Sequence, residues 1–200
     1  MLSTRLDPHR IAMRLLRIAA LTFALIATAA MPATAAMPAW QVCFTPGQDC
    51  TSVVVGQIDE ATRTVRVQAY SFTSTPILSA LKRAHDRGVD VRVIVDKSSA
   101  GKHRSGSTYT AATYLTNAEV PVWVDTKVSI AHNKVMVIDA TVVITGSFNF
   151  TAAAQKKNAE NLLVIQDRGL AKLYGDNWEK RRALSQVYSA GTKFPLGASE

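Results

Sequence analysis

The chain has few cysteines and no cysteine–histidine pattern typical of a metal site. Cys43 and Cys50 are the only two cysteines in 200 residues, and there is no C-x-x-C pair. A structural zinc site is therefore not expected. The two cysteines are close enough in sequence to close a small loop through Pro46 and Gly47. This spacing predicts a Cys43–Cys50 disulfide if the chain is exported to an oxidising compartment, with two unpaired thiols as the alternative.

The chain also lacks an apolar run long enough to span a bilayer. Its most apolar segment, Ile18 to Ala30, is interrupted by two threonines and is shorter than the roughly 20 residues that a spanning helix needs. Four arginines precede this segment and Ala33-Thr34-Ala35-Ala36 follows it, an order typical of a secretory signal peptide. We predict a signal peptide over residues 1–35, one domain over residues 36–200, and a periplasmic or secreted protein without a membrane span after cleavage. An uncleaved membrane anchor is the alternative.

Acidic residues are fewer than basic ones. The chain has 15 Asp and Glu against 23 Lys and Arg, a formal net charge of +8. Removal of residues 1–35, which hold four arginines and one aspartate, leaves +5. A basic protein suits a polyanionic partner such as nucleic acid, but charge alone does not establish one. The hydrophobic content of 48% is typical of a globular protein and not of a disordered one.

Long linkers, low-complexity tracts and internal duplications are absent from the sequence. Strand-like alternation and helix-like spacing follow one another along the chain, which predicts an α/β sandwich with a mixed sheet between helices. Thr75 is expected to cap the second helix, Ala140-Thr141 to form a turn, and residues 98–107 to form a surface loop. The expected strands are residues 41–44, 64–70, 89–96, 120–124, 135–139, 142–145 and 161–165, and the expected helices are residues 51–59, 75–88, 109–116, 151–157 and 170–184.

The residues that carry chemistry are concentrated between positions 132 and 160. His132 and Lys134 are two residues apart at a strand start, so their side chains face the same side. A tight hairpin then returns the chain, which can bring the next pair, Ser147 and Asn149, beside them. The full pattern is His132, Lys134, Asp139, Gly146, Ser147, Asn149, Asn158 and Glu160.

These residue types suit chemistry at a phosphorus centre. A neutral imidazole is a nucleophile and a proton carrier near physiological pH. Lys134 and Asn149 supply donors that can hold phosphate oxygens as charge develops. Glu160 could accept a hydrogen bond from the second imidazole nitrogen and fix its orientation. No set of carboxylates converges here to bind Mg²⁺ or Ca²⁺, so we expect no metal and no cofactor.

The spacing His132-x-Lys134-x4-Asp139, followed by Gly146-Ser147-x-Asn149, resembles the HKD signature of the phospholipase D superfamily. Three further stretches are similar to the small, single-motif bacterial endonucleases of that superfamily: residues 69–73, 87–91 and 145–151. Residues 158–161 resemble their acidic stretch after the motif.

The resemblance implies a role for each matching residue. His132 would attack phosphorus and form a phosphohistidine, while Lys134 and Asn149 bind the non-bridging oxygens with support from Ser147. Glu160 would orient a histidine. Asp139, in the same resemblance, is structural and holds the hairpin rather than touching the substrate, and Gly146 is a structural residue of the motif.

The mechanism needs a second histidine to protonate the departing oxygen, and the chain has one copy of the motif. His9 lies in the predicted signal peptide, His85 in a predicted helix and His103 in the basic loop. A two-fold dimer would bring a second His132 into the same site. We therefore predict a homodimer with one composite active site.

Basic and aromatic residues near the motif have two interpretations each. Lys97, Lys102, His103 and Arg104 follow a predicted strand and could contact the substrate or form a solvated loop. The aromatic residues are expected to fill the core rather than to stack on bases; they are Tyr70, Phe72, Phe148, Phe150 and Trp178.

Three functions agree with these observations. The first is a metal-independent endonuclease that cleaves DNA, or RNA, with little sequence preference through backbone contacts. The second is a phospholipase D that hydrolyses phospholipid headgroups by the same chemistry. The third is a non-catalytic nucleic-acid-binding protein. The basic charge favours the first, and the complete His/Lys/Asn/Glu set argues against the third.

Overall fold

The structure is a computed structural model that describes residues 39–100 and 110–189. The predicted signal peptide and three of the basic loop residues, Lys102, His103 and Arg104, lie outside the described residues. The strands are β1 (Ala39–Thr45), β2 (Thr64–Ala69), β3 (Asp90–Asp96), β4 (Val122–Asp125), β5 (Lys134–Ile138), β6 (Val142–Gly146), β7 (Glu160–Gln166) and β8 (Gln186–Val187).

These strands form one sheet in the order β1-β7-β6-β5-β2-β3-β4-β8. The neighbours β2, β3 and β4 run parallel to one another, and every other adjacent pair is antiparallel. The predicted α/β class with a mixed sheet between helices is confirmed.

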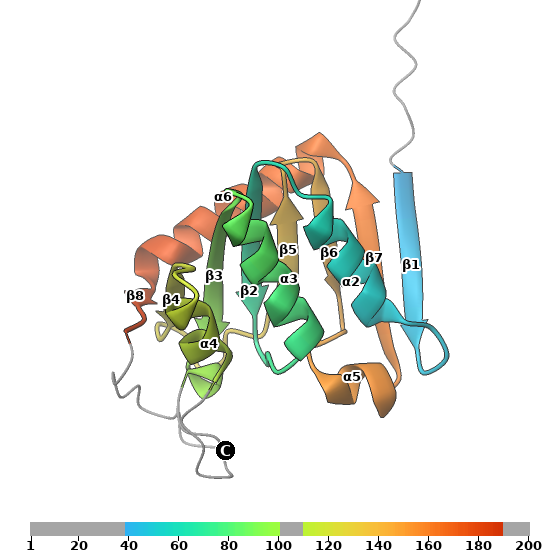
Figure 1. Cartoon of the computed structure of the whole chain (residues 1–200), viewed down its shortest axis with the longest axis horizontal. Helices are drawn as coiled ribbons and strands as arrows, with labels where there is room; N and C mark the ends of the chain where they lie inside the picture. Colours follow the sequence, from blue (N-terminus) through green and yellow to red (C-terminus); the bar gives the residue numbers. More distant parts are fainter. Residues whose placement is uncertain (1–38, 101–109, 190–200) are drawn as a thin grey trace, which may run out of the picture. The chain divides into compact units, whose positions relative to one another are not determined.

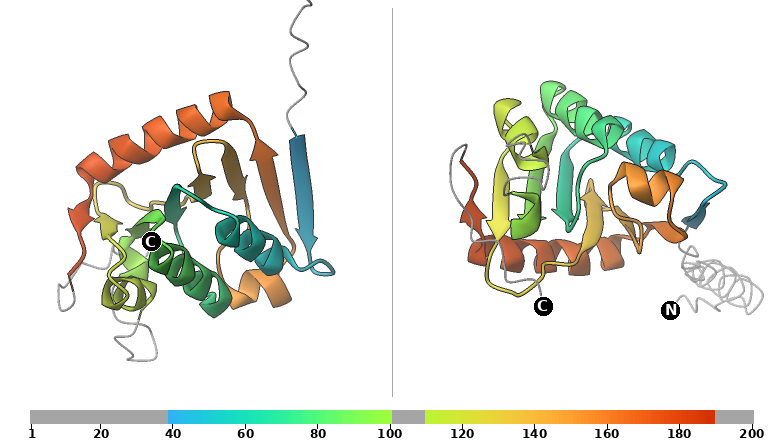
Figure 2. Two further views of the ribbon diagram at one scale, coloured as in Figure 1. Left: turned by 45° about the horizontal axis from the view of Figure 1, so that its top comes forward. Right: turned by 90° about the horizontal axis from the view of Figure 1, so that it is seen from below.

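Helices cover both faces of this sheet (Figures 1 and 2). Helices α2, α3 and α4 pack on one face, and α6 crosses the other. The helices are α2 (Cys50–Asp59), α3 (Thr75–Asp86), the 3₁₀ turn η1 (Lys97–Ser99), α4 (Ala111–Asn117), α5 (Ala152–Lys156) and α6 (Arg168–Leu184).

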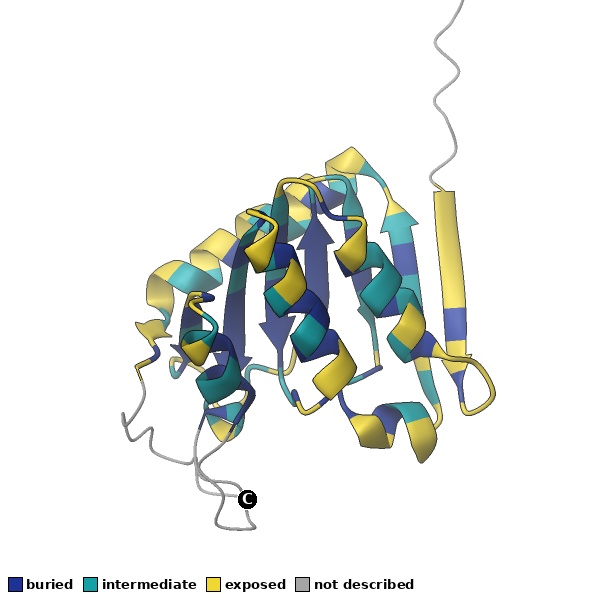
Figure 3. Cartoon of the chain, viewed as in Figure 1, coloured by how far each residue is buried: buried dark blue, intermediate teal, exposed yellow. Residues whose placement is uncertain are grey.

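The hydrophobic core lies mainly between the sheet and helices α2 to α4. Strands β2, β3 and β5 are buried along most of their length, while the outward sides of the helices and most of β1 are exposed (Figure 3). A smaller cluster under α6 consists of Val135, Val137, Val143 and Ala171. Trp178 anchors α6 to the sheet, because its indole N–H donates to the Val67 carbonyl at 2.9 Å.

Local sequence explains most helix ends, with one correction. Thr151 and Asp167 accept backbone N–H groups at the starts of α5 and α6. In α3 the N-cap is Ser74 and not Thr75, because Thr75 is already helical and Pro76 occupies the first turn. Gly88, with φ +88°, follows the end of this helix.

The hairpin between β5 and β6 turns one residue earlier than predicted. Asp139 and Ala140 both have positive φ, 52° and 55°, and the Thr141 N–H donates to the Ile138 carbonyl at 3.0 Å. Turns with two positive φ values match the twist of the paired strands. The central residues are therefore Asp139-Ala140 and not Ala140-Thr141.

At one end of the strands, the last residues of β2, β3, β4 and β6 lie beside the first residues of β5 and β7. In register, Ala69 at the end of β2 lies opposite Lys134 at the start of β5, and Gly146 at the end of β6 lies opposite Leu162 near the start of β7. Asp96 and Asp125, the last residues of β3 and β4, pair at the same edge. We call this the lower edge, as it appears in Figure 1.

The first strand is joined covalently to the first helix of the described chain. Cys43 in β1 and Cys50 at the start of α2 form a disulfide with a Cα–Cα distance of 5.7 Å. Both residues are buried. Across residues 39–100 and 110–189, no helix has both the length and the apolar character needed to cross a membrane.

Candidate active site

The lower edge carries an open cavity of about 560 Å³. Six residues from three strands and the loops beside them line it: His132, Lys134, Gly146, Ser147, Asn149 and Glu160. All six belong to the motif found in the sequence, and the hairpin β5–β6 followed by β7 brings them together.

His132 is exposed at the mouth of this cavity, and Lys134 is buried behind it. The Lys134 ammonium donates to the His132 carbonyl at 2.9 Å and lies 2.9 and 3.1 Å from the two imidazole nitrogens. It also lies 5.0 Å from the centre of the Tyr70 ring. The Tyr70 ring in turn packs on the imidazole, with ring centres 4.4 Å apart. The Tyr70 ring thus lies beside both the His132 imidazole and the Lys134 ammonium.

Burial changes the chemistry of Lys134. Desolvation lowers the pKa of its ammonium below 10.5, and the attraction of Glu160 opposes that change. A desolvated cation interacts strongly with an anion that enters the cavity. Lys134 is therefore suited to hold a phosphate oxygen.

Gly146 is required by the close approach of β6 to β7. Its φ is +142°, and a Cβ atom there would lie 2.3 Å from the backbone oxygen of Asn161. The side chain of the next residue, Ser147, accepts the Asn161 backbone N–H at 3.0 Å. The absence of a side chain at Gly146 thus lets the backbone at the end of β6 contact Asn161 near the start of β7.

Ser147 and Glu160 form a hydrogen-bonded pair. The Ser147 hydroxyl donates to Glu160 Oε2 at 2.6 Å, and the Asn158 amide donates to Oε1 at 3.0 Å. Within one chain, Glu160 makes no hydrogen bond to His132 among the described residues. Both oxygens of Glu160 are held by neighbours on its own side of the cavity, so its predicted role in orienting a histidine stays a prediction.

Asn149 presents a side chain amide without an internal partner. Its Oδ1 atom is buried and has no hydrogen-bond partner among the residues described. A buried polar atom of this kind costs free energy unless a partner arrives. Asn149 lines the cavity, and its Nδ2 group is the donor that can hold a phosphate oxygen, whereas Oδ1 can only accept a hydrogen bond.

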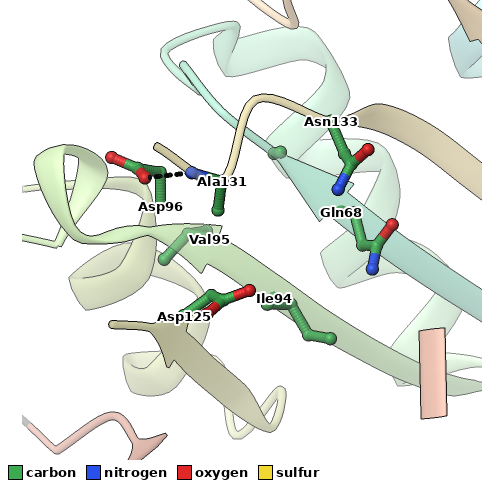
Figure 4. A pocket seen from close by; sticks show the side chains of 8 residues that line it. Gln68, Ile94, Val95, Asp96, Asp125, Ala131 and Asn133 are labelled. Carbon is green, nitrogen blue, oxygen red and sulfur yellow. Dashed lines mark hydrogen bonds between the residues drawn. The ribbon is translucent and has the colours of Figure 1, made fainter. Parts of the chain in front are cut away.

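Asp96 holds the segment that leads into His132. Its buried carboxylate accepts the Ala131 N–H at 2.8 Å from one oxygen and the Ser98 N–H at 2.8 Å from the other. Figure 4 shows the first of these bonds at a small pocket of about 10 Å³, into which Gln68 and Asn133 also point.

Sequence reasoning missed Asp96, Tyr70 and Asn161 as parts of the site. A signal was available for two of them, because polar residues at the ends of strands often line sites: Asp96 is the last residue of a strongly alternating strand, and Tyr70 directly follows another.

Asp139 lies at the opposite end of β5 from His132. Its carboxylate accepts the backbone N–H groups of Thr62, Arg63 and Thr64 at 2.8 to 2.9 Å, and the Thr62 hydroxyl at 2.8 Å. Burial opposes ionisation of Asp139, but these donors outweigh it and lower its pKa below 3.8. The residue ties the hairpin to the start of β2.

Lys97 does not line the cavity. Its ammonium donates to the Val128 carbonyl at 3.3 Å and so links η1 to the β4–β5 loop. No group of three or more His, Cys, Asp or Glu residues suited to a metal ion occurs in the part of the chain that the structure describes.

A nucleophilic imidazole, a desolvated ammonium and an amide around one cavity can hold a phosphodiester and stabilise charge on its oxygens. With the H-x-K and G-S-x-N segments on adjacent strands of an α/β sandwich, they define a phosphodiesterase of the phospholipase D superfamily.

Comparison with known proteins agrees with this class. Residues 54–182 match the family described as "Cardiolipin synthase, PLD-like domain", and the chain belongs to this family. It is 45% identical over 141 residues to a protein named phospholipase D from Rickettsia felis, covering 70% of this chain and 68% of that protein. It is 36% identical over 120 residues to the mitochondrial cardiolipin hydrolase of Xenopus tropicalis, covering 60% of this chain and 55% of that protein.

Solved structures give the same fold. The crystal structure of Nuc, a phospholipase D family member from Salmonella typhimurium, superposes with a TM-score of 0.70 at 37% identity, covering 76% of this chain and 99% of that one. NucT from Helicobacter pylori superposes with a TM-score of 0.69 at 23% identity, covering 76% and 100%, which supports the fold alone. The predicted superfamily is confirmed. The names of these relatives, which are phospholipase D, cardiolipin hydrolase, Nuc and NucT, do not fix the substrate.

Proposed function

We propose that this protein is a metal-independent endonuclease that hydrolyses DNA, or RNA, with little sequence preference. The observation that carries the proposal is the single cavity in which His132, Lys134 and Asn149 converge. The similarity to Salmonella Nuc, which extends over 99% of that chain, favours a nuclease. The net positive charge of the chain suits a polyanionic polymer.

In the proposed reaction, the His132 imidazole attacks phosphorus and forms a phosphorus–nitrogen bond. The bond from phosphorus to the leaving oxygen breaks, and a second imidazole gives that oxygen a proton. The same second imidazole then takes a proton from water, whose oxygen attacks phosphorus and releases His132. Lys134 and Asn149 hold the non-bridging oxygens in both steps.

The second imidazole is supplied by a second copy of the chain in this proposal. Among the described residues the only other histidine is His85, which lies in α3. Large apolar side chains are exposed just before His132: Val128 is 36% and Ile130 is 56% exposed. Exposed apolar side chains beside the site are compatible with a partner that covers them. A two-fold axis beside His132 would place two imidazoles in one site.

The experiment is a parallel assay on plasmid DNA and on phosphatidylcholine vesicles, each in excess EDTA. We expect nicking of the plasmid, its loss in His132→Ala, and a phosphate trapped on His132 in acid-quenched samples. Choline release without nicking would favour phospholipase D, the function that the name of the Rickettsia relative suggests. Binding of DNA without any hydrolysis would favour the non-catalytic alternative, and nicking abolished by EDTA would contradict metal independence.

We further propose export to the periplasm or the medium after cleavage of residues 1–35. The Cys43–Cys50 disulfide supports an oxidising compartment. N-terminal sequencing of protein recovered from the periplasmic fraction and from the medium tests this. A chain that keeps residues 1–35 and sediments with membranes would contradict it.

A further inference from the structure

A second, smaller pocket adjoins the candidate active site. It has a volume of about 120 Å³ and is lined by Tyr70, Ser71, Phe72, Thr73, Ser98 and Ser99. These residues come from the segment after β2 and from η1, and none of them belongs to the His/Lys/Asn motif. The segments that form this pocket thus differ from those that form the catalytic cavity.

Tyr70 lines the smaller pocket and contacts His132, which lines the catalytic cavity. One side of its ring packs on His132 and lies near the Lys134 ammonium, while the residue also lines the smaller pocket. A group bound there would therefore lie next to whatever the imidazole attacks. The sequence predicted Tyr70 as a core residue, but it is half-buried and accessible from the pocket.

The pocket is fixed in position relative to the motif. The Tyr70 N–H donates to the Asn133 carbonyl at 2.8 Å, one residue from His132, and the Thr73 N–H donates to the Phe150 carbonyl at 3.0 Å, one residue from Asn149. The Ser99 hydroxyl donates to the Tyr70 carbonyl at 2.6 Å and holds η1 against the same segment. These hydrogen bonds join the pocket to the segments that carry His132 and Asn149, and so fix its distance from a phosphorus bound between them.

The lining is rich in hydroxyl groups and has no charged side chain. The hydroxyls of Ser71, Thr73 and Ser98 make no hydrogen bond to another residue in the described parts of the chain. Neutral hydroxyls can both donate and accept, which suits sugar hydroxyls, ester oxygens and phosphate oxygens. An acyl chain would gain little from such a surface, because it offers few apolar contacts.

We propose that this pocket is a substrate subsite that binds the sugar–phosphate unit next to the scissile phosphodiester of a nucleic acid. The inference rests on the proposed nuclease function and extends it: Tyr70 separates the bond that is cleaved from the neighbouring unit, and Ser71, Thr73 and Ser98 hold that unit. A minimal phosphodiester without a flanking nucleotide would fill the catalytic cavity and leave the subsite empty.

The test compares two substrates: a decathymidylate oligonucleotide and bis(p-nitrophenyl) phosphate. The variants are Ser71→Ala/Thr73→Val, which removes two hydroxyls, and Ser98→Tyr, which fills the pocket from an exposed position. We expect the ratio of kcat/KM for the oligonucleotide to kcat/KM for the small ester to fall about tenfold in Ser71→Ala/Thr73→Val, since two lost hydrogen bonds are worth about that factor. In Ser98→Tyr the ratio should fall at least as far, because the ring blocks the pocket. The fall should appear in KM for the oligonucleotide.

Ser79→Ala is the matched control, because Ser79 lies in α3 and lines neither cavity; its ratio should equal that of the wild type. Thermal melting of every variant identifies any that fails to fold. If the double variant fails to fold, Ser98→Tyr decides the outcome. A wild-type enzyme that cleaves the oligonucleotide, with variants that keep the wild-type ratio, overturns the subsite but not the nuclease. A wild-type enzyme that cleaves only the small ester or phosphatidylcholine vesicles overturns both.

Discussion

Lys134 is a buried cation, and burial makes it costly for folding. Only 7% of the residue is exposed, and desolvation lowers the pKa of its ammonium below 10.5. Its neighbours in the site are the imidazole of His132, a backbone carbonyl and the Tyr70 ring, and no carboxylate of the described residues contacts it directly. We infer that this side chain is retained for phosphate binding at the expense of stability.

Replacement of Lys134 by methionine should therefore raise stability while abolishing hydrolysis. We expect a gain of about 1 kcal/mol at neutral pH, or a rise in Tm of roughly 2–4 °C, measured by thermal unfolding. At pH values between the lowered pKa and 10.5, Lys134 holds a proton in the unfolded chain but not in the native one. The free energy of unfolding of the wild type therefore rises with pH in this range, and the advantage of Lys134→Met over the wild type shrinks. Lys180→Met, on the exposed side of α6, is the control. A destabilised Lys134→Met would contradict the argument.

Asp139 is the converse case, a carboxylate whose ionised form is favoured. Its lowered pKa reflects donors from Thr62, Arg63 and Thr64 that outweigh burial. Such a group stabilises the fold at pH values above its unfolded pKa, and this contribution is lost as the pH falls through the folded pKa.

Asp139→Asn should cost about 2 kcal/mol at pH 7, since an amide cannot satisfy several donors as a carboxylate does and the site is partly screened by water. Urea unfolding from pH 7 down to about pH 3 measures it. The gap between wild type and variant should close as the pH drops below about 4. Asp86→Asn removes an exposed i,i+4 pair with Lys82 and should cost no more than about 0.5 kcal/mol. A gap that is as wide at pH 3 as at pH 7 would show that charge is not the cause.

At the scale of elements, the edge strand β1 supports the start of β7. Thr45 lies opposite Glu160 in register, and its hydroxyl donates to the Ala154 carbonyl at 2.9 Å. The disulfide from Cys43 to Cys50 fixes this strand to α2. Because β1 pairs with β7 alone among the described strands and is largely exposed, the covalent link is an important constraint on its position.

Loss of this link in Cys43→Ser/Cys50→Ser should destabilise the protein by about 2.5 kcal/mol, the loop-closure estimate for a short loop. Hydrogen exchange should accelerate in residues 39–45 and change little in β2 and β3, which lie in the sheet interior. Chemical unfolding of the wild type with and without reductant gives an independent value. Exchange that accelerates equally in β1 and β3 would show that the link stabilises the whole domain and not the edge strand.

At the scale of the whole molecule, the cavity described here contains one imidazole, and the proposed reaction uses two. The exposed Val128 and Ile130 beside His132 are consistent with a partner that covers them. A composite site makes activity a property of the pair of chains.

Co-expression of wild-type and His132→Ala chains with different affinity tags tests this. We expect a doubly tagged heterodimer with less than about a tenth of the wild-type activity, because general acid–base catalysis commonly contributes a hundredfold or more. A heterodimer of wild type with Lys180→Met should be fully active. Failure to recover a doubly tagged species, together with a fully active monomer in sedimentation, would refute the composite site.

Period and spacing predicted most elements to within one or two residues. Strands such as Thr64–Ala69 alternate strictly, and the α6 segment keeps its helical pattern over four turns. Strand β8 was missed because Gln186–Val187 is too short to show a period. The N-cap of α3 was placed one residue late because both Ser74 and Thr75 are good capping residues.

The type of chemistry could be predicted from local spacings alone, because a strand places the residues of H-x-K and G-S-x-N on the same side whatever the rest of the fold does. The surroundings of these residues could not, since they depend on the tertiary structure. The pairing of β5 between β6 and β2 brings Tyr70 onto His132, Asp96 reaches Ala131 across 35 residues, and Glu160 is held by Ser147 rather than by His132. These contacts depend on which strands become neighbours, and local periodicity carries no information on that choice.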